Sequence, residues 1–299
     1  MSTLRVTVGS QQQSALARIQ AASAKLESKQ QQLSSGLRIT KPSDDPAGTA
    51  QALALSAQMS RNTQYTANAN DAISFLTTAD TAYSSIQTQL QKASTLVLQA
   101  MNTGAASSTS QSALADQLDS LRNSILAVAN TSYNGQTIFG GTSSGSTAFD
   151  PTTGEYLGDS GSVLRTVGEN NTVAINQNGI DVFGANGSNV FDTLTQISTA
   201  LRSGTATNAS LGTQLTTLQS QTGNISVQQA KEGAVYDQVQ QAQTVAATVG
   251  DQLKIGYSNI TEADFAQSVI DVTTANTAYQ AALQTTAIVS QQSLLNFLK

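Results

Sequence analysis

Apolar side chains recur every three to four residues at both ends of the chain. Near the start these positions are Leu16, Ile19, Leu26 and Leu33, with Ser23 and Gln30 in the same register. Near the finish they are Phe265, Val269, Val272, Tyr279, Leu283, Ala287, Leu294 and Leu298. This spacing predicts an amphipathic helix in each segment, with a narrow apolar stripe suited to pairing with another helix. Neither helix can bury its stripe alone.

A second, longer helix is predicted to begin at Pro46. The chain breaks at 34–36 and again at 41–46, where Asp45 precedes Pro46. This order is typical of a helix start, because the carboxylate accepts hydrogen bonds from free amides and proline has no amide to leave unpaired. Apolar positions continue to about Asn102, and at about 1.5 Å per residue such a helix is roughly 85 Å long. After a small-residue turn at 104–110, a returning helix is predicted over 114–128.

The composition changes between Tyr133 and Val190, where Gly, Asn, Asp, Ser and Thr dominate. Short β-type runs occur at 137–139, 163–167, 172–175 and 180–183. Gly and Asn separate them at hairpin-like intervals, which predicts a small β domain with hairpin turns. Helical periodicity then resumes over 191–201 and 207–253. After a break at Gly256, a last helix is predicted to begin at Thr261, with Asp264 as its capping-box partner.

Together these elements predict a mainly α fold. We expect an elongated, antiparallel bundle of long helices with terminal coiled-coil arms and one small inserted β domain. The predicted segments are an N-terminal assembly arm (1–41), the N-terminal half of a helical rod (42–135), the β domain (136–190), the C-terminal half of the rod (191–258) and a C-terminal assembly arm (259–299).

Composition suggests an unusual core for a chain of 299 residues. Only 5% of the residues are aromatic and 11% are charged, and Trp is absent. Small side chains each bury little area. We therefore expect stability to come from long helices packed along their lengths rather than from a globular centre.

Several classes of chemistry are excluded or disfavoured. Cys and His are both absent, which removes thiol nucleophiles, His-dependent catalysis, disulfides and nearly every common zinc or haem site. We expect no enzymatic activity, no cofactor and no metal. The net charge of −5 and the lack of a basic cluster argue against nucleic-acid binding. No apolar run approaches the roughly 18–20 residues that span a bilayer, and residues 1–10 lack a secretion-signal pattern, so the chain is either cytoplasmic or exported by another route.

The charges of the two arms differ in sign. Residues 1–41 hold six basic residues against Glu27 alone, a net charge of +5, whereas residues 260–299 carry a net charge of −2. Opposite signs favour pairing of the arms, although exposed pairs each contribute only about 0.2–1 kcal/mol. The alternative is a pair of solvated faces.

Two local constellations invite a functional interpretation. Asp44 and Asp45 are adjacent carboxylates, but consecutive side chains at a helix start diverge, so we interpret them as capping residues rather than as a catalytic pair. The apolar C-terminus, with Leu294, Leu295, Phe297 and Leu298, forms a patch of the kind reserved for interfaces if it is exposed. It serves self-assembly or a chaperone contact, or else it packs against the chain's own core.

Two sequence signatures resemble the bacterial flagellin family. The first is Leu33-Ser34-Ser35-Gly36-Leu37-Arg38-Ile39 followed by Asp44-Asp45-Pro46-Ala47-Gly48, and the second runs from Ala275 to Leu283 and closes with Ser293–Leu298. Within the family, Lys41-Pro42-Ser43-Asp44-Asp45-Pro46, Ile138-Phe139-Gly140-Gly141-Thr142 and the single modest insertion are similar to the branch that forms the hook-to-filament junction.

The resemblance implies a motility function: a self-assembling structural subunit, secreted by flagellar type III export without a cleaved signal, with terminal ends that fold on assembly. Implied partners are further copies in a ring, hook-associated protein 1 on the hook side, flagellin filament subunits and an export chaperone on the C-terminal arm. Alternatives are filament flagellin itself, a cytoplasmic coiled-coil binding module and, with least support, a carboxylate-dependent hydrolase in the β insertion.

Overall fold

The computed structural model describes residues 8–102 and 108–297, without the side chains of 8, 9, 11 and 289–297. Over these residues the chain forms seven helices and four short strands, which confirms a mainly α fold with long helices. The chain divides into two compact units. The first comprises Met1–Arg61 and Gly250–Lys299, and the second comprises Asn62–Val249.

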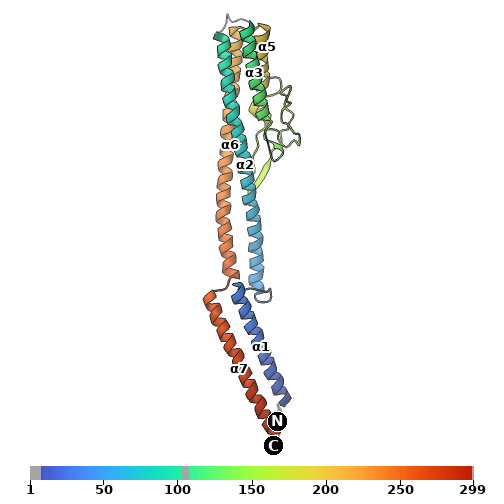
Figure 1. Cartoon of the computed structure of the whole chain (residues 1–299), viewed down its shortest axis with the longest axis vertical. Coiled ribbons are helices and arrows are strands. Elements are labelled where there is room, and N and C mark those ends of the chain that lie inside the picture. The colour runs from blue at the N-terminus through green and yellow to red at the C-terminus, as the bar shows by residue number, and fades with distance from the viewer. Residues whose placement is uncertain (1–7, 103–107, 298–299) are drawn as a thin grey trace. The chain divides into compact units, whose positions relative to one another are not determined.

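The first unit is built on two terminal helices, α1 (Val8–Ser35) and α7 (Phe265–Phe297), which pack against each other (Figure 1). It also contains the start of α2 (Pro46–Asn102) and the end of α6 (Asn208–Thr261). Gly36 has a left-handed backbone conformation (φ +69°), which ends α1 at small steric cost. The chain just beyond Gly36 then forms an antiparallel bridge between Leu37 and Glu262.

In the second unit α2 and α6 run antiparallel, side by side (Figure 1). Three hydrogen-bonded pairs along the seam are Asn62 with the Ala246 carbonyl (2.7 Å), Asn70 with Gln243 (2.5 Å) and Asp80 with Gln229 (2.7 Å). Residue numbers rise on α2 while they fall on α6. Beside this pair, α3 (Ser108–Ala129) packs against α5 (Val190–Ser203). The two long helices and this shorter pair provide the surfaces on which the inserted segment packs.

The inserted segment contains two antiparallel hairpins. Strands β1 (Ser132–Tyr133) and β2 (Gln136–Thr137) are joined by Asn134 and Gly135, both with positive φ, which suits the twist of a tight hairpin. Strands β3 (Leu164–Gly168) and β4 (Asn171–Ala174) pair in the register Leu164–Ala174 and Thr166–Thr172. Arg165 of β3 binds Asp71 of α2 at 2.8 Å, which fixes this hairpin to the long helix.

The prediction of a fourth β run at 180–183 is wrong. These residues belong to a short helix, α4 (Gly179–Phe183), whose N-cap is Asn178, with the Asn178 side chain accepting from the Ile180 amide. Gly184, with φ +100°, ends it. Local capping therefore outweighed the β propensity of Ile180, Val182 and Phe183, and the turn of helix buries the last two side chains.

The boundary predicted near Gly256 is also wrong. Helix α6 continues through Gly256 to Thr261, because a single glycine costs a helix only about 1 kcal/mol. Thr261 is therefore the end of α6 rather than a cap of α7. Asp264 caps α7 instead, and its Oδ1 accepts from the Gln267 amide at 3.2 Å.

A compact aromatic cluster occupies the second unit, contrary to the expectation that no globular centre would contribute. Ring centroids lie 5.0–5.4 Å apart in the contacts among Phe139, Phe149, Phe183 and Phe191, and all four side chains are buried. Tyr83 of α2 packs edge-on against Phe139. The few aromatic residues are thus concentrated where the inserted segment meets the helices.

Candidate assembly surface

The first unit has almost no core of its own. Over its described residues, the buried positions are Gly48, Ala52, Thr261 and Ala275, all of them small. Because stabilisation by apolar burial scales with the area removed from water, these four side chains contribute little. The described part of the helix pair α1–α7 therefore lacks the large buried side chains that the second unit has in abundance.

Large apolar side chains in this unit instead face solvent. Phe265 is 72% exposed and Leu16 is 58% exposed. The others described on the arms are Leu37, Val269, Ile270, Leu283 and Ile288, and on the adjoining helix ends they are Leu53 and Ile255. A run of such residues along a helix pair is typical of a surface that another chain covers.

The structure divides the predicted interface residues into two groups. Leu16, Phe265, Val269 and Leu283 are exposed, whereas Ile19, Leu26, Leu33, Val272 and Tyr279 are half-buried. Leu298 lies outside the described residues, as do the side chains of Leu294, Leu295 and Phe297. The sequence interpretation missed Ile270 and Ile288, because each lies one position beside the apolar stripe that the three-to-four spacing selected.

Among the described side chains, one ion pair joins the two arms. Lys29 Nζ lies 2.8 Å from Asp271 Oδ2, and both side chains are about one-third exposed or less. Hydrogen bonds from Lys29 and from Gln267 hold the pKa of Asp271 below its ordinary value. Basic and acidic residues of the two arms therefore do meet at one point, although a partly solvated pair of this kind adds little stability.

Arg38 joins the end of one long helix to the start of another. Its backbone amide donates to the Thr261 carbonyl (2.7 Å) and its Nη2 donates to the Ile260 carbonyl (2.7 Å), so it satisfies two carbonyls that α6 leaves unpaired. Its Nη1 lies 3.1 Å from Asp45 Oδ2 at the start of α2. The positive charge lies near a helix C-terminus and the negative charge at a helix N-terminus, which is the favourable placement for both helix dipoles.

The two adjacent carboxylates have separate structural roles. Asp45 Oδ1 accepts from the Gly48 amide (2.8 Å), which caps α2 immediately before Pro46. Asp44 Oδ2 accepts from the Thr40 hydroxyl (2.8 Å) and the Lys41 amide (2.9 Å), which closes the turn around Pro42. These hydrogen bonds hold the pKa of each carboxyl below its ordinary value. Neither carboxylate is arranged as an acid or base for catalysis.

Gly48 is a tight point in this junction, and we predict that Gly48→Ala destabilises the first unit. A Cβ at residue 48 would lie 2.8 Å from Ile39 Cδ1 and 2.8 Å from Asp45 Cγ. Overpacking of this kind costs about 1–3 kcal/mol, which exceeds the gain of about 1 kcal/mol that alanine brings to a helix interior. Hydrogen exchange of the amides in 36–50, followed by mass spectrometry, should be at least several-fold faster in the variant.

Gly256→Ala is the matched control in the same unit. Its added Cβ would make only an ordinary contact, 3.7 Å from Leu55 Cδ1. This variant should exchange as slowly as the parent chain or more slowly. Equal exchange in the Gly48→Ala variant and the parent would show that the junction is not tightly packed.

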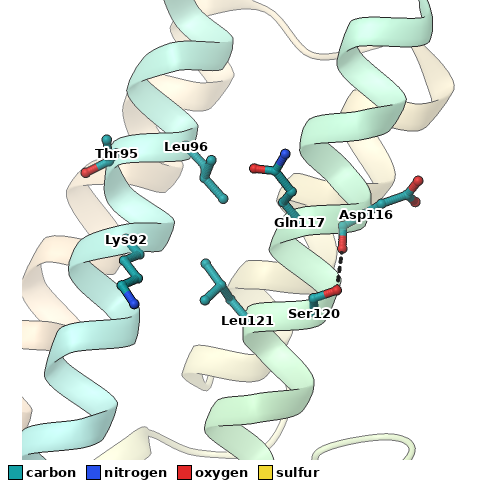
Figure 2. A pocket seen from close by; sticks show the side chains of 7 residues that line it. All are labelled: Lys92, Thr95, Leu96, Asp116, Gln117, Ser120 and Leu121. Carbon is teal, nitrogen blue, oxygen red and sulfur yellow. Dashed lines mark hydrogen bonds between the residues drawn. The ribbon is translucent and has the colours of Figure 1, made fainter.

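A groove of about 620 Å³ lies between α2 and α3 in the second unit (Figure 2). Leu96 and Leu121 point toward each other across it, and Lys92, Thr95, Asp116, Gln117 and Ser120 form its rim. Its lining offers no nucleophile activated by a neighbouring base.

Over the described part of the chain, no cluster of three acidic side chains suits a metal ion. None of the described helices is long and apolar enough to cross a membrane.

Comparisons with known proteins agree with the arrangement of the helices. The family model for the bacterial flagellin N-terminal helical region matches residues 8–144, and that for the bacterial flagellin C-terminal helical region matches residues 215–298. The crystal structure of flagellar hook associated protein-3 from Legionella pneumophila covers 70% of this chain and 98% of that chain, with a TM-score of 0.62 and 15% identity. At that identity the likeness concerns the fold.

Two relatives in sequence extend the comparison. Flagellar hook-associated protein 3 of Salmonella typhimurium strain LT2 is 33% identical over 160 residues, which is 53% of this chain and 50% of that protein. Flagellin of Bacillus subtilis strain 168 is 28% identical over 276 residues, 88% of each chain. The present chain therefore spans about half the length of the hook-associated protein that it matches. The matched helical regions at both ends, which together cover roughly three quarters of the chain, show that it belongs to the flagellin family.

Proposed function

We propose that this chain is a structural axial subunit of the bacterial flagellum, located at the junction between the hook and the filament. The observation that carries the proposal is the first unit: among its described residues, only small side chains are buried, while Phe265, Leu16 and Ile270 face solvent. Such a surface has a simple use in a helical assembly, where terminal helices of neighbouring copies cover one another. In this role the chain has no enzymatic activity.

The energetics favour arms that become ordered through assembly. Fixing one residue of backbone costs about 1–2 kcal/mol, whereas burying a large apolar side chain contributes about 1.5–3 kcal/mol. Within one chain the arms bury too few large side chains to offset that cost over α1 and α7. Neighbouring copies supply the missing area, so growth is restricted to a surface that already presents folded arms.

Two observations support the junction rather than the filament. The relative that is 33% identical is a hook-associated protein 3, and the structural neighbour carries the same description. Two segments also resemble that branch, the Pro42-to-Pro46 turn and Ile138–Thr142. In the structure Asp44 closes the turn by a hydrogen bond, and Ile138 and Phe139 are buried. Filament flagellin is the second candidate, because the Bacillus subtilis flagellin matches over 88% of both chains.

The partners follow from this location. Copies of the chain would form a ring, with hook-associated protein 1 on the hook side and flagellin subunits on the filament side. The C-terminal arm would bind an export chaperone before secretion through the flagellar type III route. Each of these contacts would cover part of the apolar surface that includes Phe265, Val269 and Leu283.

Removal of the gene from its source bacterium tests the proposal. Loss of a junction subunit should leave bare hooks while flagellin, still exported, collects in the culture medium. Loss of the filament subunit should leave bare hooks and no flagellin in the medium. Electron microscopy of the cells and an immunoblot of the medium distinguish these results, and normal filaments would overturn both candidate functions.

A further inference from the structure

Glu232 is a buried acid of the second unit, in the seam between α2 and α6. Its side chain is only 4% exposed. It faces Tyr83 of α2, which is fully buried and packs edge-on against Phe139. It also lies near the carboxylate of Asp80, which is one helical turn before Tyr83 on α2. A carboxyl in this position is expected to have a compensating partner, because an unpaired buried charge is costly.

Among the residues that the structure describes, no cation forms an ion pair with Glu232. Glu232 Oε1 and the Tyr83 hydroxyl are both buried without a well-formed hydrogen bond over the described residues. Lys231, the neighbouring cation, donates to Gln228 Oε1 at 3.3 Å instead. The side-chain amide of Gln229 donates to Asp80 Oδ1 at 2.7 Å rather than to Glu232.

The remaining groups around Glu232 add no positive charge. Tyr236 and Asp237 of α6 line the same groove, of about 640 Å³, together with Thr77 and Asp80 of α2. Burial raises the pKa of Glu232 to about 8, and the negative charge of Asp80 acts in the same direction, whereas the hydroxyl of Tyr83 lowers it. Burial also raises the pKa of Tyr83, so its hydroxyl stays protonated.

We propose that Glu232 makes the α2–α6 seam a pH-sensitive switch: the seam is closed while the carboxyl is protonated and loosens locally when it ionises. In the closed state a neutral acid packs under Tyr83 beside Asp80. An ionised Glu232 would place two carboxylates close together, one of them buried, and the groove gives water access once the helices separate. This inference is independent of the assembly role proposed above.

Stability depends on pH because the pKa of Glu232 differs between the unfolded and the folded chain. An unfolded chain ionises Glu232 at its ordinary pKa of 4.5, whereas the folded chain holds the proton until about pH 8. The contribution of Glu232 to the free energy of unfolding is therefore largest below about pH 4.5, and it falls as the pH rises toward 8. Between these values the folded state binds one more proton, so the unfolding equilibrium constant rises by up to tenfold per pH unit, and above pH 8 this contribution levels off.

The experiment compares the parent full-length chain with Glu232→Gln and Asp237→Asn. Urea unfolding from pH 5 to pH 9 should show the rise in the unfolding constant in the parent and in Asp237→Asn, which changes an exposed carboxylate of the same groove. Glu232→Gln should lose most of that dependence. Amide hydrogen-exchange protection in 76–90 should fall between pH 7 and pH 9 in the parent and stay constant in Glu232→Gln.

A further variant keeps the test decisive if Glu232→Gln does not fold. Asp80→Asn removes the nearby negative charge, so ionisation of Glu232 becomes easier and the pH dependence should end at a lower pH than in the parent. Identical pH profiles in the parent, Asp80→Asn and any folded Glu232→Gln would overturn the switch. A parent profile without the rise below pH 8 would do the same.

Discussion

Replacing Phe265 by Asp, or Leu283 by Asp, is expected to abolish incorporation of the chain into flagella while leaving the free chain folded. Both side chains are exposed in the isolated chain, at 72% and 42%. Exposed substitutions usually change stability by no more than about 0.5 kcal/mol. In an assembly that covers these residues, each variant would bury an unpaired carboxylate, which costs several kcal/mol. Immunoblots of sheared flagella from a complemented deletion strain measure incorporation, and circular dichroism of the purified chain measures folding.

Gln280→Asp is the matched control for these variants. It introduces the same charge on α7 at an exposed polar position. We expect this variant to be incorporated far better than the other two. If Phe265→Asp and Leu283→Asp chains both enter flagella at the parent level, the exposed apolar side chains of α7 are not an assembly surface.

Phe183→Ala is expected to lower the free energy of unfolding of the second unit by about 3–5 kcal/mol, the usual cost of a large cavity in a packed core. The Phe183 ring is buried and contacts Phe139, Phe149 and Phe191, with centroids 5.3, 5.0 and 5.4 Å away. These three partners lie elsewhere in the chain, so removing the shared ring weakens every contact at once. Urea unfolding followed by far-ultraviolet circular dichroism provides the measurement.

The same substitution at an exposed ring is the control. Phe265→Ala deletes an identical side chain from the surface of α7 and should change the free energy of unfolding by less than about 0.5 kcal/mol. A similar cost for both variants would mean that the aromatic cluster does not carry the stability of the second unit.

Helix positions were well predicted wherever a local signal marked them. Helix α2 begins at Pro46 and ends at Asn102, as the Asp45-Pro46 cap and the apolar spacing indicate. Capping depends on side chains within three residues of one another, so it can be recognised without knowledge of the fold. The errors occurred where local signals conflict with packing: Gly256 suggested a break that α6 bridges, and Ile180–Phe183 suggested a strand where Asn178 caps a turn of helix.

The candidate site was predicted less completely than the fold. The three-to-four spacing identified Phe265 and Leu283 but could not separate exposed positions from half-buried ones such as Tyr279. That distinction depends on the angle at which α1 and α7 meet, which no short sequence window contains. The role of Arg38 was also hidden, because its acceptors at Ile260 and Thr261 lie more than two hundred residues further along the chain.

The sequence by itself determined the helical character of the chain, the positions of its long helices and the absence of Cys and His chemistry, because backbone periodicity, capping and composition are local properties. Only the tertiary structure decided which apolar side chains remain uncovered, how scattered aromatic rings form one cluster, and that Glu232 lies against Tyr83 near Asp80. These juxtapositions join residues far apart in the chain, such as Glu232 and Asp80, which are 152 positions apart. They arise from the packing of whole helices against one another, and that packing sets both the exposed surface and the protonation of the buried acid.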